Sequence, residues 1–145
     1  MNRIARIAGP AVLLLVGFVA LLTALVIGGG ANPALIADPG PVVRFGLPIA
    51  RLVVDLSAAT TIGGLALATV GLSRSGPEWN RAIDVAAGAS GVWTVASAVA
   101  TFCTFLSVAG SRISIDEQFG QSMGVFLTGT ELGLAWLVTV LVAAA

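Results

Sequence analysis

The sequence predicts an all-α, polytopic transmembrane protein: a four-helix bundle whose N-terminus and C-terminus both lie in the cytoplasm. Two observations predict this class. Hydrophobic residues make up 57% of the 145 residues and charged residues only 10%, whereas an ordinary soluble domain has about 25% charged residues. Four apolar segments are also long enough, at about 1.5 Å per residue, to cross a hydrocarbon core of about 30 Å. They are residues 10–29, 44–72, 81–109 and 123–145.

Composition excludes several classes of function. Seven basic and seven acidic residues give a net charge of zero, so the chain offers no basic face to a nucleic acid. Histidine is absent, which removes the most common metal ligand and the most common general base. No pair of nucleophile and base is present in the sequence, so we expect that the chain is not an enzyme. The single cysteine, Cys103, excludes a disulfide within the chain.

The first predicted helix, residues 10–29, is almost purely aliphatic. A cleaved signal peptide is the alternative interpretation, because Arg3 and Arg6 precede this segment and small residues follow it. The apolar part of a signal peptide usually runs about 7–15 residues, so the greater length here favours a membrane-spanning helix. Residues 31–43, which are rich in helix-breaking proline and turn-forming residues, then predict a loop.

The third and fourth predicted helices, residues 81–109 and 123–145, are rich in small residues. In lipid, small residues let helix backbones approach closely, so residues 86–91 place the third helix at the centre of the bundle. In the fourth helix and the loop before it, glycines at small-xxx-small spacing predict a second packing face. The chain is still apolar at Ala145, and we therefore expect that it is a fragment of a longer protein.

The distribution of arginine in the predicted short loops gives the orientation. Basic residues near membrane-spanning helices are retained on the cytoplasmic side. More of them precede the first helix or flank the second loop than lie on the opposite side. The first group is Arg3, Arg6, Arg74 and Arg81, and the second is Arg44 and Arg112. Both ends are therefore predicted inside.

The main candidate site is an intramembrane polar cluster of Arg51, Asp55 and Glu131. An ionisable side chain at the middle of a spanning helix costs about 2.5–3.5 kcal/mol, so each needs a partner. Arg51 and Asp55 are four residues apart on one helix face, and Glu131 is a second carboxylate that the guanidinium could hold. All three are predicted at depths of about 10–16 Å, in the outer leaflet. The cluster is interpreted as an ion-pair staple between the second and fourth helices, or alternatively as an outward-facing polar cavity for an ion, a proton or a lipid head group.

Soft metal ligands are scarce. Copper prefers cysteine, methionine and histidine, and the chain offers Cys103 and Met123 besides the initiator Met1. Two soft ligands do not complete a site, and a lone buried cysteine commonly acts as a small hydrophobic residue. We therefore expect no cofactor in this chain, with Cys103 and Met123 as weak candidate metal ligands.

Several short motifs are spread over the three segments that follow the first loop. They are Asp38-Pro39-Gly40-Pro41, Gly46-Leu47-Pro48 with Arg51, Ala89-Ser90-Gly91-Val92-Trp93-Thr94-Val95, Leu106-Ser107-Val108-Ala109-Gly110 and Glu131-Leu132-Gly133-Leu134-Ala135-Trp136. Together they resemble the copper-resistance D family, over most of residues 32–140. The likeness is closest to the N-terminal part of actinobacterial membrane proteins in which this domain precedes a cytochrome c oxidase assembly domain. The motifs are helix-packing and loop signatures rather than a catalytic signature.

The resemblance implies a multi-pass plasma-membrane protein concerned with copper transport, copper tolerance or copper delivery for cytochrome c oxidase assembly. It implies copper as a ligand of the full-length protein, with the ligands in a further C-terminal portion because this sequence has no histidine. The alternative, based on small-residue helix faces and scarce ligands, is a non-transporting membrane scaffold or interaction subunit. For both functions the expected partners are the lipid bilayer and further membrane helices of the same or another chain, and no nucleic acid.

Overall fold

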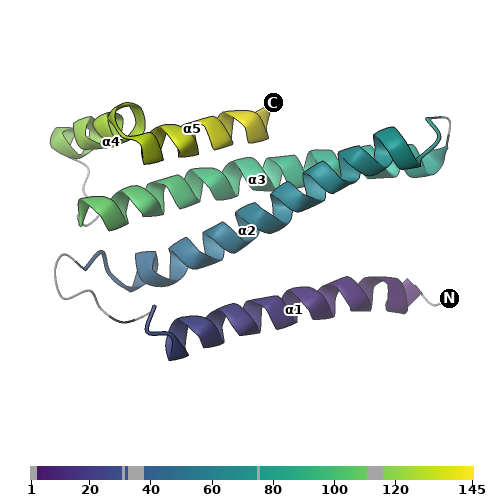
Figure 1. Ribbon diagram of the computed structural model, residues 1–145, viewed down its shortest axis with the longest axis horizontal. Coiled ribbons are helices and arrows are strands. Elements are labelled where there is room, and N and C mark those ends of the chain that lie inside the picture. Colours follow the sequence, from purple (N-terminus) through teal and green to yellow (C-terminus); the bar gives the residue numbers. More distant parts are fainter. Residues whose placement is uncertain (1–2, 31, 33–37, 75, 111–115) are drawn as a thin grey trace.

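The computed structural model describes residues 3–30, 32, 38–74, 76–110 and 116–145, and its regular structure is helical (Figure 1). Its elements are α1 (Arg3–Ile27), α2 (Pro41–Ala66), a π-helical segment η1 (Leu67–Gly71), α3 (Pro77–Ala109), α4 (Glu117–Gly129) and α5 (Glu131–Ala144). No strand occurs in the described part of the chain, which confirms the predicted all-α class.

Helix α3 is the centre of the structure. Figure 1 shows α1, α2, α3 and α5 lying roughly along one direction and alternating in sense. Helix α3 packs against both α2 and α5, and it carries the largest set of buried residues of any helix. The predicted central place of this helix is confirmed. The predicted reason is confirmed only in part, because most buried residues of α3 lie between Ala96 and Leu106, while Gly88 and Gly91 of the small-residue stretch are exposed.

Two helices are long and apolar enough to cross a membrane. They are the continuous segment of α2 and η1 (Pro41–Gly71) and α3 (Pro77–Ala109). Helices α4 and α5 would form a third span if the bent pair is taken as one. Within α1 the described apolar stretch is Val12–Ile27, which is shorter than a full span. The chain thus has the helices of a membrane protein, while the fourth span and the cytoplasmic placement of both ends stay predictions.

Close contacts at two points define the register of α2 against α3. A Cβ placed on Gly46 would lie 3.9 Å from the Cys103 Sγ atom, and one on Gly64 would lie 3.2 Å from the Cβ of Ala86. The two helices are antiparallel, so the eighteen-residue step along α2 is matched by a similar step along α3. Interpolation between these points places Arg51 level with Ala98, and Asp55 one helical turn further along.

This register also gives the level of the charged residues along α3. Between Asp84 and the end of α3 at Ala109 there is no charged residue, a length of about 37 Å at 1.5 Å per residue. Ser97 lies at the middle of that stretch. Arg51 and Asp55 therefore lie beside the middle of the charge-free part of α3, and their depth in the outer leaflet stays a prediction.

Helix α5 is tied to α3 by a hydrogen bond between helices. The Ser90 hydroxyl donates to the Ala143 carbonyl oxygen at 2.5 Å, and Trp136 packs against the buried cluster that Ala96 and Ala100 form with α2. Counting back from Ala143 puts Glu131 about 18 Å along α3 from Ser90. Glu131 is then about one helical turn from the level of Arg51.

The fourth predicted helix is broken. We predicted one helix over residues 123–145, but α4 ends at Gly129, α5 begins at Glu131, and their axes differ by 84°. The linking Thr130 is extended, with φ −118° and ψ 143°, and its side-chain oxygen accepts a hydrogen bond from the Gly133 N–H at 3.0 Å. The same hydroxyl donates to the Phe126 carbonyl oxygen at 2.7 Å. Thr130 thus caps both half-helices, which offsets the backbone hydrogen bonds lost at the bend.

The remaining helix boundaries differ from prediction by up to seven residues, and the largest difference is at the start of α1, which begins at Arg3 rather than at residue 10. Helices α2 and α3 begin at Pro41 and Pro77, where proline fits the first helical position because no amide partner is needed there. Helix α3 ends at Ala109 as predicted, and the following Gly110 has φ 58°, a left-handed conformation that glycine adopts without strain. Helix α4 begins at Glu117, inside the segment that we predicted as the third loop.

Candidate functional site

The structure places the three residues of the predicted polar cluster at similar levels along their helices. No ion pair joins them. Arg51, Asp55 and Glu131 are all exposed. None of the three forms an ion pair within 4.0 Å, and none has another polar contact among the described residues. The staple between the second and fourth predicted helices therefore stays a prediction, and the charges face outward from the chain.

Buried polar atoms occur on α3 at the same level. The Trp93 indole N–H and the Ser97 hydroxyl lie one helical turn apart, and neither has a hydrogen-bond partner in the described structure. Ser97 is completely buried, whereas the nearby Thr101 and Thr104 hydroxyls donate to carbonyl oxygens of their own helix. Buried donors without partners are places where a water molecule or a passing ligand gains hydrogen bonds.

The two sulfur side chains meet in one cluster near the C-terminal end of α3. Cys103 is buried with Val43, Phe105, Leu106 and Phe126, and Met123 packs against this group together with Phe119. We call these residues the sulfur–aromatic cluster. It joins α2, α3 and α4, so a thiol and a thioether that are distant in sequence share one apolar environment.

Aromatic side chains build most of this cluster. The ring of Phe105 lies 5.3 Å from Phe119 and 5.5 Å from Phe126, in edge-to-face and tilted arrangements. Such ring pairs stabilise a fold by about 0.5–1.5 kcal/mol beyond their burial. Sequence reasoning missed this cluster. The signal that could have found it is the presence of two phenylalanines in α4 seven residues apart, on one helix face.

The donor set for a metal ion in the described residues is incomplete. Those residues contain no group of three or more histidine, cysteine, aspartate or glutamate side chains placed to hold a metal ion. Cys103 and Met123 are the soft donors at hand, and both contact an apolar cluster. Copper sites normally use three or more ligands, so these two side chains do not complete such a site by themselves.

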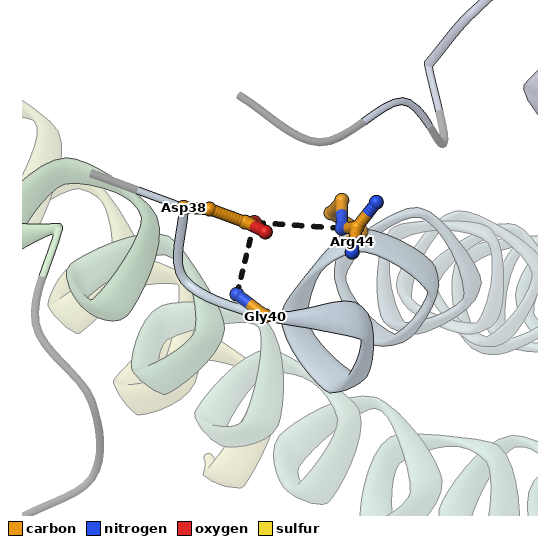
Figure 2. A network of polar contacts seen from close by, with 3 residues as sticks. All are labelled: Asp38, Gly40 and Arg44. Atoms are coloured by element: carbon orange, nitrogen blue, oxygen red, sulfur yellow. Dashed lines mark hydrogen bonds and ion pairs between the residues drawn. The ribbon is translucent and has the colours of Figure 1, made fainter. Parts of the chain in front are cut away.

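A polar network anchors the start of α2 (Figure 2). The Asp38 Oδ1 atom accepts a hydrogen bond from the Gly40 N–H at 3.1 Å and lies 3.5 Å from Arg44 Nε. Gly40 has φ 95°, a conformation that other residues rarely adopt, and Pro41 then starts the helix. The carboxylate near the helix N-terminus also complements the helix dipole. From the sequence, these residues were predicted only as part of a loop and as one of the family motifs.

We expect Asp38→Ala to lower the free energy of unfolding by about 1 kcal/mol, because it removes the turn hydrogen bond and the counter-charge of Arg44. Thermal unfolding of the purified protein in detergent measures the change. Asp38→Asn is the matched control, since it keeps an acceptor for the Gly40 N–H and should lose less than half as much. Equal stability of the wild type and D38A would contradict this role for the turn.

A comparison with known protein families matches residues 37–145 to the family described as copper resistance protein D-like, N-terminal domain. This match covers well over half of the chain. The chain belongs to this family. None of the curated proteins and none of the solved structures compared with the chain matched it.

The copper-resistance D-like domain begins at the Asp38 turn and includes α2 to α5, while α1 precedes it. Motifs quoted for the resemblance correspond to contacts in this domain. Asp38 holds the first turn of α2, Gly46 allows the approach to Cys103, Ser90 ties α3 to α5, and Gly133 lies at the bend. These motifs therefore specify turns and helix packing.

Proposed function

We propose that this domain is the membrane-embedded part of a copper-handling protein of the plasma membrane, acting in copper transport, copper tolerance or copper delivery for oxidase assembly. The family match over residues 37–145 carries the proposal, because it covers every helix of the central packing unit. The two helices of spanning length support a location in a membrane.

The sulfur–aromatic cluster is the part of the domain that we assign to copper contact. Its thiol and thioether are the side chains in the described structure that a soft monovalent ion prefers. The cluster lies toward the end of α3 where the ion would enter or leave the apolar region. Further ligands would come from other parts of the full protein.

Copper content of intact cells tests the function. Cells that express the chain should differ from vector controls in cell-associated copper and in growth under copper excess. Cys103→Ser with Met123→Leu removes both sulfur atoms at similar volume, and we expect it to reach the membrane normally but to lose the copper response. Identical copper content in wild-type and vector cells, at matched growth, would contradict the proposal.

Copper retention by the purified chain should be weak. Two soft donors cannot provide a full ligand set, so the protein should hold no stoichiometric Cu(I) after dialysis. Elemental analysis of the dialysed protein measures this, with Cys103→Ala as the control. One retained equivalent that disappears in C103A would show a complete site at Cys103.

A non-transporting membrane scaffold is the second candidate. The incomplete donor set in the described residues favours it. The two functions differ in the copper measurement above, since a scaffold changes neither copper content nor growth under copper excess. A scaffold should instead co-purify with partner helices in amounts that C103S/M123L does not change.

A further inference from the structure

Helix α2 presents two opposite charges on its exposed face, near the middle of the spanning segment Pro41–Gly71. Arg51 and Asp55 are exposed, lie one helical turn apart, and are level with the centre of the charge-free stretch of α3. Neither forms an ion pair with a described residue. Lipid chains offer such charges no hydrogen bonds, so another polypeptide surface must cover them in a membrane.

The other helices of this chain do not provide that cover. Between Arg6 and Asp38 the sequence has no charged residue, and the Thr23 hydroxyl of α1 already donates to the Val19 carbonyl oxygen. If Glu131 joined Arg51 and Asp55, the two carboxylates would outnumber the one guanidinium and leave an excess negative charge. The apolar groove between α2 and α3, which Gly46, Ile49 and Val53 help to line, does not include either charge.

The charged pair belongs to a longer seam on α2. Residues on this face recur at alternating spacings of four and three, which is the pattern of helices that pack side by side with a small crossing angle. They are Arg51, Asp55, Ala58, Ile62, Leu65 and Thr69, and all are exposed except the half-buried Ala58. The seam is therefore free over most of the length of α2 and η1.

We propose that this seam binds the same seam of a second copy of the chain. Two copies inserted in the same orientation are related by a two-fold axis along the membrane normal, so their α2 helices are parallel and at equal depth. Each Arg51 then lies opposite Arg51 of the other copy, and its long side chain reaches Asp55 of that copy one turn away along the axis. The four charges together form a neutral cluster in which two reciprocal ion pairs join the copies.

Cysteine cross-linking in membranes tests the contact. The chain carrying Cys103→Ser has no other cysteine, and Ala58→Cys adds one at the middle of the seam. Oxidation should give a disulfide-linked dimer of twice the 14.5 kDa chain mass. Val95→Cys is the matched control, since Val95 is 66% exposed at nearly the same depth on α3 and should give no dimer.

Charge reversal identifies the ion pairs. In the A58C background, R51D makes the seam wholly acidic and D55R makes it wholly basic. Each should lower the dimer yield at least about tenfold, which corresponds to 1.4 kcal/mol. When the two variants are co-expressed with different tags, they should cross-link to each other at close to the original yield. Ion pairs within one helix are absent from both variants, because each variant carries two like charges. Such pairs therefore cannot produce this rescue.

Several results would overturn the proposal. They are equal yields from A58C and V95C, unchanged yields in both reversals, failed rescue by co-expression at normal membrane levels, and a cross-link to a different protein. If the single reversals do not accumulate in the membrane, the uncharged R51Q/D55N variant tests the ion pairs instead. Its yield should fall, and an unchanged yield would exclude the ion pairs. This inference does not rest on copper handling, because cross-linking reports assembly alone.

Discussion

Replacing Gly133 with alanine should disrupt the junction of α4 and α5 and lower the free energy of unfolding by about 3 kcal/mol or more. A Cβ on Gly133 would overlap the Phe126 carbonyl oxygen and would lie 2.7 Å from the carbonyl carbon of Phe126 and 2.9 Å from the Leu127 Cα. These are backbone atoms, so no side-chain rotation can relieve the overlap. The bend of 84° cannot persist unchanged with any larger residue at this position.

Detergent-solubilised protein unfolded by heat or by a denaturing detergent provides the measurement for G133A. Gly124→Ala is the matched control in α4, because a Cβ there meets nothing within 4 Å. Alanine is the better helix former, so the control should be neutral or gain up to about 1 kcal/mol. If G133A were as stable as the wild type, α4 and α5 would have to form the straight helix that the sequence predicted.

Replacing Ala100 with leucine should separate α2 from α3 and lower the free energy of unfolding by about 3 kcal/mol. Ala100 has no exposed surface, and it packs in a cluster with Ala50, Val54 and Ala96. A larger side chain must push one helix away. In lipid the association of these helices depends on close packing, because no hydrophobic force compensates for a gap.

Unfolding of A100L can be followed by tryptophan fluorescence, since Trp93 and Trp136 pack against the same cluster. Val99→Leu is the matched control, because Val99 is the neighbouring residue and is 48% exposed. The control should change stability by less than about 0.5 kcal/mol. Similar losses in A100L and V99L would mean that the approach of α2 to α3 is not limited by the residue at position 100.

The local sequence predicted the positions of the helices better than it predicted the contacts between them. Residues 81–109 were predicted as the central helix, and α3 spans Pro77–Ala109 at the centre of the packing. The break at Thr130 was missed because neither threonine nor the preceding glycine stops a helix by itself. It depends on the contact of Gly133 with the Phe126 backbone and on the two hydrogen bonds of the Thr130 side chain.

For the candidate site, too, the sequence identified the residues and only the structure placed them. Sequence alone identified Arg51, Asp55 and Glu131 as charges inside apolar helices, and Cys103 and Met123 as the soft donors. Their levels and neighbours required the register of α2 on α3, which places Arg51 near Ala98, beside the middle of the charge-free part of α3. The structure also brought Cys103 and Met123 to one aromatic cluster although they are twenty residues apart.

By itself, the sequence determined that this protein is helical and apolar, because a chain in lipid must satisfy its backbone hydrogen bonds locally. Composition and the length of the apolar segments are enough for that conclusion. Only the tertiary structure decided the register of α2 on α3, the bend at Thr130 and the outward direction of the α2 charges. The register depends on close approach between small residues far apart in sequence, such as Gly64 with Ala86, and local patterns do not specify which small residues meet.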